Sequence, residues 1–79
     1  MESRRKQILF IEDDDSTRWL LGESFKRVDA DFSFACSVAE GKSQIDGSQF
    51  DLIICDYYLG DGVGADVFNH LRCRSWDLI

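Results

Sequence analysis

The sequence predicts an α/β fold with one small parallel sheet. Two continuous apolar runs, residues 8–11 and 52–55, are too short for helices and end abruptly in acidic residues, as strands buried on both faces do. Segments with helical apolar spacing lie between and after these runs, and buried strands separated by helices are typical of parallel sheets. The 79 residues can build one small core, so we expect a single domain or a piece of one.

The first predicted helix follows the first strand. It begins at Asp14 or Asp15, because a carboxylate at either position can accept hydrogen bonds from the free amides of a first helical turn. Apolar residues then recur at the spacing i, i+4, i+7, as expected for one buried face. This stripe consists of Leu21, Phe25 and Val28, widened by Leu20.

A change of period predicts the second strand and the second helix. Residues 32–36 alternate with a period of two, which is typical of a half-buried edge strand. Ser37 and Glu40 have the spacing of a capping box, in which the serine hydroxyl accepts from the Glu40 amide and the glutamate reaches back. We expect a short helix to about Ile45, weakened by Gly41 in its interior.

A glycine-rich segment connects the second buried strand to the last predicted helix. Residues 57–64 contain three glycines, so we expect a loop with unusual backbone angles. In the helix that follows, Val67, Phe68 and Leu71 share one face. The predicted order is therefore three strands alternating with three helices.

Composition disfavours several classes of function. Fifteen acidic residues against nine Lys and Arg give a net charge of −6, which disfavours binding to nucleic acid or anionic lipid and favours a cation or a basic partner. No apolar run approaches the roughly 20 residues of a membrane-spanning helix, so we predict a cytoplasmic protein without membrane contact. The three cysteines lack C-x-x-C spacing, which indicates neither a disulfide framework nor a thiolate zinc site.

Acidic residues follow both apolar strands, at the edge of a parallel sheet where ligands bind. If the two strands are neighbours, Glu12, Asp13 and Asp56 converge, and three carboxylates in one place repel one another unless some are protonated or a divalent cation lies among them. Oxygen ligands without nearby His or Cys favour Mg²⁺ or Mn²⁺ over zinc. The alternative is that these acids only cap helices or remain solvated, which is the interpretation we favour for Asp14 and Asp15.

Two motifs resemble the receiver domain of two-component response regulators. The first is IEDD at residues 11–14, followed by Arg18 and a leucine pair on the next helix; the second is FDLIICDYYLGDGVG at residues 50–64. The matches occur in the family's order and spacing over residues 8–71. The resemblance implies a flavodoxin-like, receiver-type parallel sheet in which the first strand lies between the second and the third.

The resemblance also implies roles for individual residues. Asp56 occupies the position of the aspartate that accepts a phosphoryl group from the phosphohistidine of a histidine kinase or phosphotransfer protein. Glu12 and Asp13 fall on the acidic pair that holds Mg²⁺, and the backbone carbonyl of Tyr58 falls where the family supplies a further metal oxygen. These roles describe signal transduction by a phosphoprotein that is not itself an enzyme acting on a separate substrate.

The sequence departs from the family pattern in two ways. Gly60 replaces the usual proline, so we expect a looser loop after the third strand without loss of metal binding. Residues 1–79 resemble a partial receiver domain, without the fourth and fifth strands and their helices, and so without the Ser or Thr and the Lys that respond to the phosphoryl group. We therefore expect phosphorylation of this chain to be impaired.

The partial resemblance also predicts self-association. A sheet that ends at residues 52–55 presents an apolar, unpaired edge, and the apolar stripe of the first helix loses a helix that would cover it. We therefore expect a homo-oligomer, joined at that edge or through the first helix.

Two other functions remain open from the sequence. The chain could be a non-catalytic interaction module derived from a receiver. Residues 13–17 also resemble the Asp-x-Asp-x-Thr signature of haloacid-dehalogenase phosphatases, with Asp13 as nucleophile and Asp15 as general acid and base, although Ser16 replaces the usual glycine.

Overall fold

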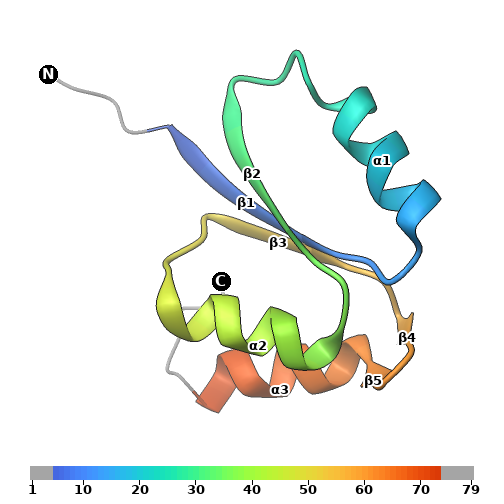
Figure 1. The fold of residues 1–79 in the computed structure, drawn as a ribbon. Coiled ribbons are helices and arrows are strands. Elements are labelled where there is room, and N and C mark those ends of the chain that lie inside the picture. The colour runs from blue at the N-terminus through green and yellow to red at the C-terminus, as the bar shows by residue number, and fades with distance from the viewer. Residues whose placement is uncertain (1–4, 74–79) are drawn as a thin grey trace, which may run out of the picture.

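The fold is a three-layer α/β arrangement in which a small sheet lies between one helix and a pair of helices (Figure 1). The computed structural model describes residues 5–73. The elements are β1 (Lys6–Ile11), α1 (Asp15–Ser24), β2 (Ala30–Ala35), α2 (Val38–Gly47), β3 (Leu52–Cys55), β4 (Tyr58–Leu59), β5 (Gly62–Val63) and α3 (Gly64–Cys73). The predicted α/β class is confirmed.

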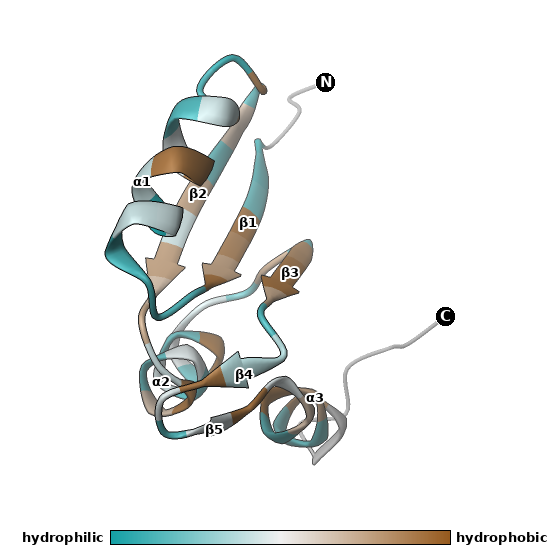
Figure 2. Ribbon diagram, turned by 90° about the vertical axis from the view of Figure 1, so that its right-hand side faces the viewer, coloured by the Kyte–Doolittle hydropathy of each residue, from teal (hydrophilic) through white to brown (hydrophobic). Residues whose placement is uncertain are grey.

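The main sheet is parallel and has the predicted strand order β2-β1-β3. In its central strand, Leu9, Phe10 and Ile11 are at most 2% exposed, so the prediction of burial on both faces is confirmed for β1. Because side chains alternate along a strand, Leu9 and Ile11 point to one face of the sheet and Phe10 to the other. Figure 2 shows the carboxyl-terminal part of β1 and the whole of β3 coloured as hydrophobic.

Helices α2 and α3 cover the face that carries Leu9 and Ile11. The core on this side adds residues of both helices and partly buried residues of β3: Val38, Ile45, Val67, Leu71, Ile53 and Cys55. Gly41 lies at the closest approach of α2 to β1, since a Cβ at this position would be only 2.7 Å from Cδ1 of Ile11. The glycine that weakens α2 locally therefore allows the helix to lie against the sheet.

Aromatic rings fill the other face. The ring of Phe10 stacks on Phe32 and Phe34 of β2 at centroid distances of 5.7 and 5.4 Å. Phe25, at the carboxyl end of α1, contacts Phe10 at 5.5 Å and Phe32 at 5.9 Å. These ring contacts hold helix α1 over β1 and β2. On β2 they are made by the alternating aromatic residues that the sequence predicts for the second strand.

This placement corrects the prediction that the third strand is buried on both faces. Leu52 and Ile54 are 49% and 40% exposed. They pair in register with Ile8 and Phe10, so they point to the α1 side of the sheet, where the contacts of α1 are with β1 and β2. One face of β3 therefore remains open in the described part of the chain.

Three helical positions also differ from prediction. Helix α1 ends at Ser24, so Val28 lies beyond it and is 45% exposed, and Leu20 is 58% exposed on its outer side. In α3, Val67 and Leu71 are buried one turn apart, whereas Phe68 is turned away from them and is 49% exposed. The periodicity identified each helix but overestimated the width of its buried face.

The glycine-rich segment forms a small antiparallel hairpin, and none of its glycines has a φ in the left-handed region, so the predicted loop with unusual backbone angles is wrong. Tyr58 of β4 pairs with Val63 of β5, and Leu59 pairs with Gly62. The Gly64 amide closes its base by donating to the Tyr57 carbonyl at 2.7 Å. A Cβ on Gly64 would lie 2.9 Å from the Asp56 carbonyl oxygen, so this close contact requires a glycine.

The predicted capping box of α2 is confirmed. The Ser37 hydroxyl accepts from the Glu40 amide at 3.0 Å, and the Glu40 carboxylate reaches back to the Cys36 amide at 2.6 Å. The helix extends to Gly47, two residues beyond the expected end. Within residues 5–73, no helix is long and apolar enough to cross a membrane.

Candidate metal centre

Backbone hydrogen bonds of the sheet bring the acidic residues together. The Glu12 amide donates to the carbonyl of Ala35 at the end of β2, at 2.9 Å. The Asp56 amide donates to the carbonyl of Ile11 at 3.0 Å, so the residue after β3 is tied to the residue just before Glu12. The parallel pairing of β1 with β3 therefore places residues that are 44 positions apart at one edge of the sheet.

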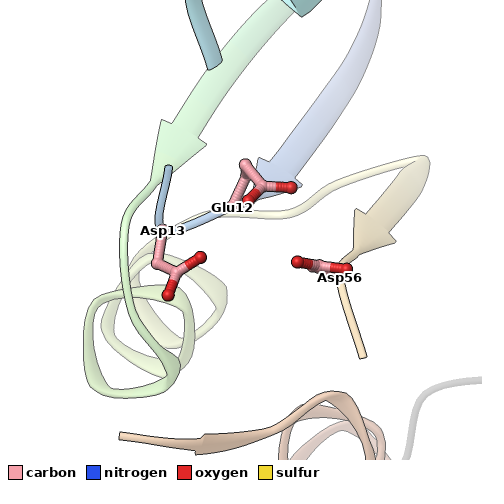
Figure 3. Close-up of side chains that lie close together, drawn as sticks. All are labelled: Glu12, Asp13 and Asp56. Carbon is pink, nitrogen blue, oxygen red and sulfur yellow. The ribbon is translucent and has the colours of Figure 1, made fainter. Parts of the chain in front are cut away.

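Glu12, Asp13 and Asp56 form the cluster that the sequence predicts. One carboxylate oxygen from each side chain lies within 4.8 Å of the other two. Glu12 is half-buried, while Asp13 and Asp56 are exposed. Figure 3 shows the three carboxylates around one shared space beyond the ends of β1 and β3.

The cluster is electrostatically unfavourable without a cation. Partial burial raises the pKa of Glu12, and the nearby negative charges of Asp56 and Asp13 raise it further, against a hydrogen bond from the Asp14 amide that lowers it. A divalent cation would remove this repulsion by binding the charged form of all three groups.

The donor set fits Mg²⁺ or Mn²⁺. All three side chains offer hard oxygen ligands, and no His or Cys joins the cluster among the described residues. Octahedral Mg²⁺ separates its ligand oxygens by about 3 to 4 Å, which small side-chain rotations could reach from the separations present.

Asp56 has one oriented oxygen and one free of protein donors. Its Oδ1 accepts a hydrogen bond from the Tyr57 amide at 3.0 Å, while none of the described residues donates to Oδ2. Tyr58 begins β4 two residues later, and its side chain packs edge-on against Tyr57 with ring centroids 4.7 Å apart. Coordination by the Tyr58 carbonyl stays a prediction.

Arg18 and Asp14 hold the acidic turn between β1 and α1. The Arg18 guanidinium donates to the Glu12 carbonyl at 2.7 Å and also pairs with Asp15. Asp14 is the N-cap of α1, since its carboxylate accepts from the amide and hydroxyl of Thr17, each at 2.8 Å. The capping role predicted for Asp14 is confirmed, whereas Asp15 pairs on the helix surface and does not join the cluster.

Sequence reasoning missed the contribution of Asp61. This residue lies in the turn of the β4–β5 hairpin, and its carboxylate accepts from the Val38 amide at 2.8 Å and from the Ala39 amide at 3.0 Å. Its partners are 23 and 22 residues away, so local spacing could not identify them. The Gly-Asp-Gly sequence indicated a turn but not the contact.

Solved structures similar to this chain are receiver domains. The signal receiver domain of a putative Luxo repressor protein from Vibrio parahaemolyticus is 26% identical, with a TM-score of 0.87 over 91% of this chain. The non-phosphorylated HemR receiver domain from Leptospira biflexa is 27% identical, with a TM-score of 0.83 over 94%. A response regulator receiver protein from Pseudomonas putida is 20% identical, with a TM-score of 0.81 over 91%.

The similarity covers part of each of these structures. The chain spans 55% of the Vibrio structure and 60% of each of the other two. No protein-family model and no curated protein matches the sequence. The predicted resemblance is confirmed at the level of fold: from β1 to α3, the chain has the architecture of response-regulator receiver domains.

Proposed function

We propose that the chain acts in two-component signalling by accepting a phosphoryl group on Asp56. The observation that carries this proposal is the meeting of Glu12, Asp13 and Asp56 at the end of the β1–β3 pair, in a fold shared with receiver domains. The cluster combines a nucleophilic carboxylate with two further acids that could hold a divalent cation.

The geometry of Asp56 suits attack on phosphorus. The Tyr57 amide holds Oδ1, which leaves Oδ2 as the attacking atom. Oδ2 would form a bond to the phosphorus of a phosphohistidine as the phosphorus–nitrogen bond breaks, and the imidazole would leave with the electron pair and take a proton from solvent. The product carries a charge of about −2 where Asp56 carried −1.

The cation would be held by Glu12, Asp13, Asp56 and the Tyr58 carbonyl. When bound, Mg²⁺ or Mn²⁺ supplies charge neutralisation that lets an anionic carboxylate approach an anionic phosphoryl group. Arg18 keeps the Glu12 backbone in place at 2.7 Å, so the ligands on the first acidic turn are oriented before the cation binds.

The phosphoryl donor is a histidine kinase or a phosphotransfer protein in the cytoplasm. The protein itself is a phosphoprotein and not an enzyme with a separate substrate, and its net charge of −6 argues against a direct role in binding nucleic acid. Residues 1–79 contain no counterpart of the receiver lysine that contacts the phosphoryl group, so we expect these residues alone to be phosphorylated slowly.

Mass labelling with acetyl phosphate tests this proposal. Wild-type protein should gain one phosphoryl group in Mg²⁺, should gain none in EDTA, and the label should map to Asp56. Asp56→Asn should abolish the label, while Asp15→Asn, which changes an acid outside the cluster, should retain it. Absence of label from the wild type in Mg²⁺ would contradict the proposal and favour the interaction module.

The same variants test the phosphatase alternative. If Asp13 is the nucleophile, the label should persist in Asp56→Asn and disappear in Asp13→Asn. The structure favours Asp56, because Asp15, the general acid in the alternative, pairs with Arg18 and lies outside the carboxylate cluster.

We also propose that a second copy of the chain covers the open side of β3. Leu52 and Ile54 expose apolar surface on an outer strand, and both flank the edge where backbone groups can pair with another strand. Sedimentation at micromolar concentration should show a dimer that Leu52→Lys disrupts. Phe68→Lys, a change at an equally exposed residue on α3, should leave it intact, and Leu20→Lys tests association through α1. A wild-type monomer would contradict this proposal.

A further inference from the structure

Asp61 connects the turn of the β4–β5 hairpin to the start of α2. Its two carboxylate oxygens accept from the amides of Val38 and Ala39 at 2.8 and 3.0 Å. Ser37 satisfies the next amide, that of Glu40, at 3.0 Å. The first turn of α2 is therefore capped twice, once by its own N-cap and once by a residue more than 20 positions later.

The same turn also borders the carboxylate cluster. A Cβ on Gly60 would lie 3.8 Å from Oδ2 of Asp13, so the backbone of the turn passes beside one of the candidate ligands. A Cβ on Gly62 would lie 3.1 Å from Cγ2 of Val38, so the other side of the turn packs closely on α2. Asp61 lies between these two contacts.

The hairpin has little to stabilise it on its own. Each of its strands has two residues, and isolated hairpins are marginal in water even when longer. Its glycines add conformational entropy to the disordered alternative. Leu59 is buried, the Gly64 amide closes the base, and the Asp66 carboxylate accepts from the Val63 amide at 3.0 Å, but the tip of the turn is fixed by Asp61. The bonded amides lower the pKa of Asp61, so the carboxylate is ionised and holds them at neutral pH.

We infer that Asp61 is a positioning residue for the cation site: by binding the first turn of α2, it holds the β4–β5 hairpin, and with it the Tyr58 carbonyl, beside Asp13. The inference rests on the proposed function for the identity of the site. A positioning residue differs from a purely structural helix cap in one respect. A cap stabilises α2 and nothing else, whereas a positioning residue also affects the order of the hairpin and the affinity for the cation.

Ser37→Ala is the matched control for Asp61→Ala. Both variants remove an N-cap of the same helix, but only the second releases the hairpin. Asp61→Ala should weaken Mg²⁺ binding, measured by calorimetry, by about tenfold, whereas Ser37→Ala should leave it within about twofold. Asp61→Asn, which retains one acceptor oxygen, should fall between them and serves if the alanine variant does not fold.

Hydrogen exchange provides a second readout that needs no metal. The Gly62 amide, in the residue pair with Leu59, and the Gly64 amide, which donates to the Tyr57 carbonyl, should exchange about tenfold faster in Asp61→Ala than in the wild type, and at the wild-type rate in Ser37→Ala. Equal hairpin exchange and equal Mg²⁺ affinity in the two variants would overturn the inference and leave Asp61 as a helix cap. A wild type that binds no Mg²⁺ would instead refute the proposed function, and the exchange rates would still decide whether Asp61 orders the hairpin.

Discussion

Replacement of Gly41 by alanine tests how closely α2 must approach the sheet. Alanine in a helix interior ordinarily stabilises by about 1 kcal/mol over glycine. Here the new Cβ would lie 2.7 Å from Cδ1 and 3.3 Å from Cγ1 of Ile11, whose side chain is only 1% exposed and has little room to move. Overpacking of this kind costs about 1 to 3 kcal/mol, so we expect Gly41→Ala to lose about 1 kcal/mol of unfolding free energy.

A double-mutant cycle separates this contact from other effects. Ile11→Val removes Cδ1, the nearest atom, and alone should cost about 1 kcal/mol. In the double variant alanine regains its helical advantage without the overlap, so its stability should return near that of the wild type. The two changes should therefore be coupled by about 2 kcal/mol, beyond the range of additive sites.

The assay is urea unfolding followed by circular dichroism, with Gly47→Ala as the control. Gly47 ends the same helix, and a Cβ there meets nothing within 4 Å, so its replacement should be neutral or stabilising. Because Ile11 directly precedes Glu12, Gly41→Ala should also weaken Mg²⁺ binding, and Ile11→Val should restore it. If Gly41→Ala is more stable than the wild type and the cycle is additive, the close approach is not the reason for the glycine.

Three further predictions concern charge and packing. In EDTA and low salt, Asp56→Asn should raise the unfolding free energy by at most about 1 kcal/mol, because the substitution removes charge repulsion within the carboxylate cluster. This gain should shrink in 1 M salt. An unchanged or lower unfolding free energy would contradict the prediction. Hydrogen bonds from Gln7, which has the larger effect, and from Arg5 lower the pKa of Asp31 below its ordinary 3.8. The ionised Asp31 carboxylate therefore stabilises the folded state fully above pH 3.8, and this stabilisation is lost as the pH falls through the lower pKa of the folded state. Urea unfolding between pH 5 and 2.5 should therefore show a shallower loss in Asp31→Asn than in the wild type, and equal slopes would refute this. Phe10→Ala should cost about 3 to 5 kcal/mol and leave no cooperative transition by circular dichroism, since the ring contacts three other phenylalanines; a cooperative transition near that of the wild type would show that the aromatic face is dispensable.

Local patterns in the sequence predicted most of the fold and the clustering of three acidic residues. The run at 8–11 ends in acids because β1 passes from a buried interior to the open edge of the sheet. Asp14 and Ser37 cap the helices that they precede, as their spacing indicates. The convergence of Glu12 with Asp56 followed from strand adjacency, because parallel pairing alone determines which strand ends meet.

Features that depend on tertiary contacts were not predictable in the same way. The apolar side chains of Leu52 and Ile54 predict a strand that is buried on both faces, but their exposure depends on which strands α1 covers. The hairpin of β4 and β5 has only two residue pairs and thus no periodicity to detect. The hydrogen bond from the Val38 amide at the start of α2 to Asp61 joins residues more than 20 positions apart. The Gly-Asp-Gly segment that contains Asp61 is equally compatible with a turn that makes no such contact.

Under the proposed function, the separation of the acidic residues along the chain would link cation binding to folding. Glu12 and Asp56 are 44 residues apart, so an unfolded chain seldom holds them together, and the site exists only once β1 and β3 have paired. A ligand that binds only the native state shifts the unfolding equilibrium by mass action, by about 2.7 kcal/mol at a hundred times its dissociation constant. Under the proposed function, millimolar magnesium would then raise the fraction of this small domain that is folded and able to accept a phosphoryl group.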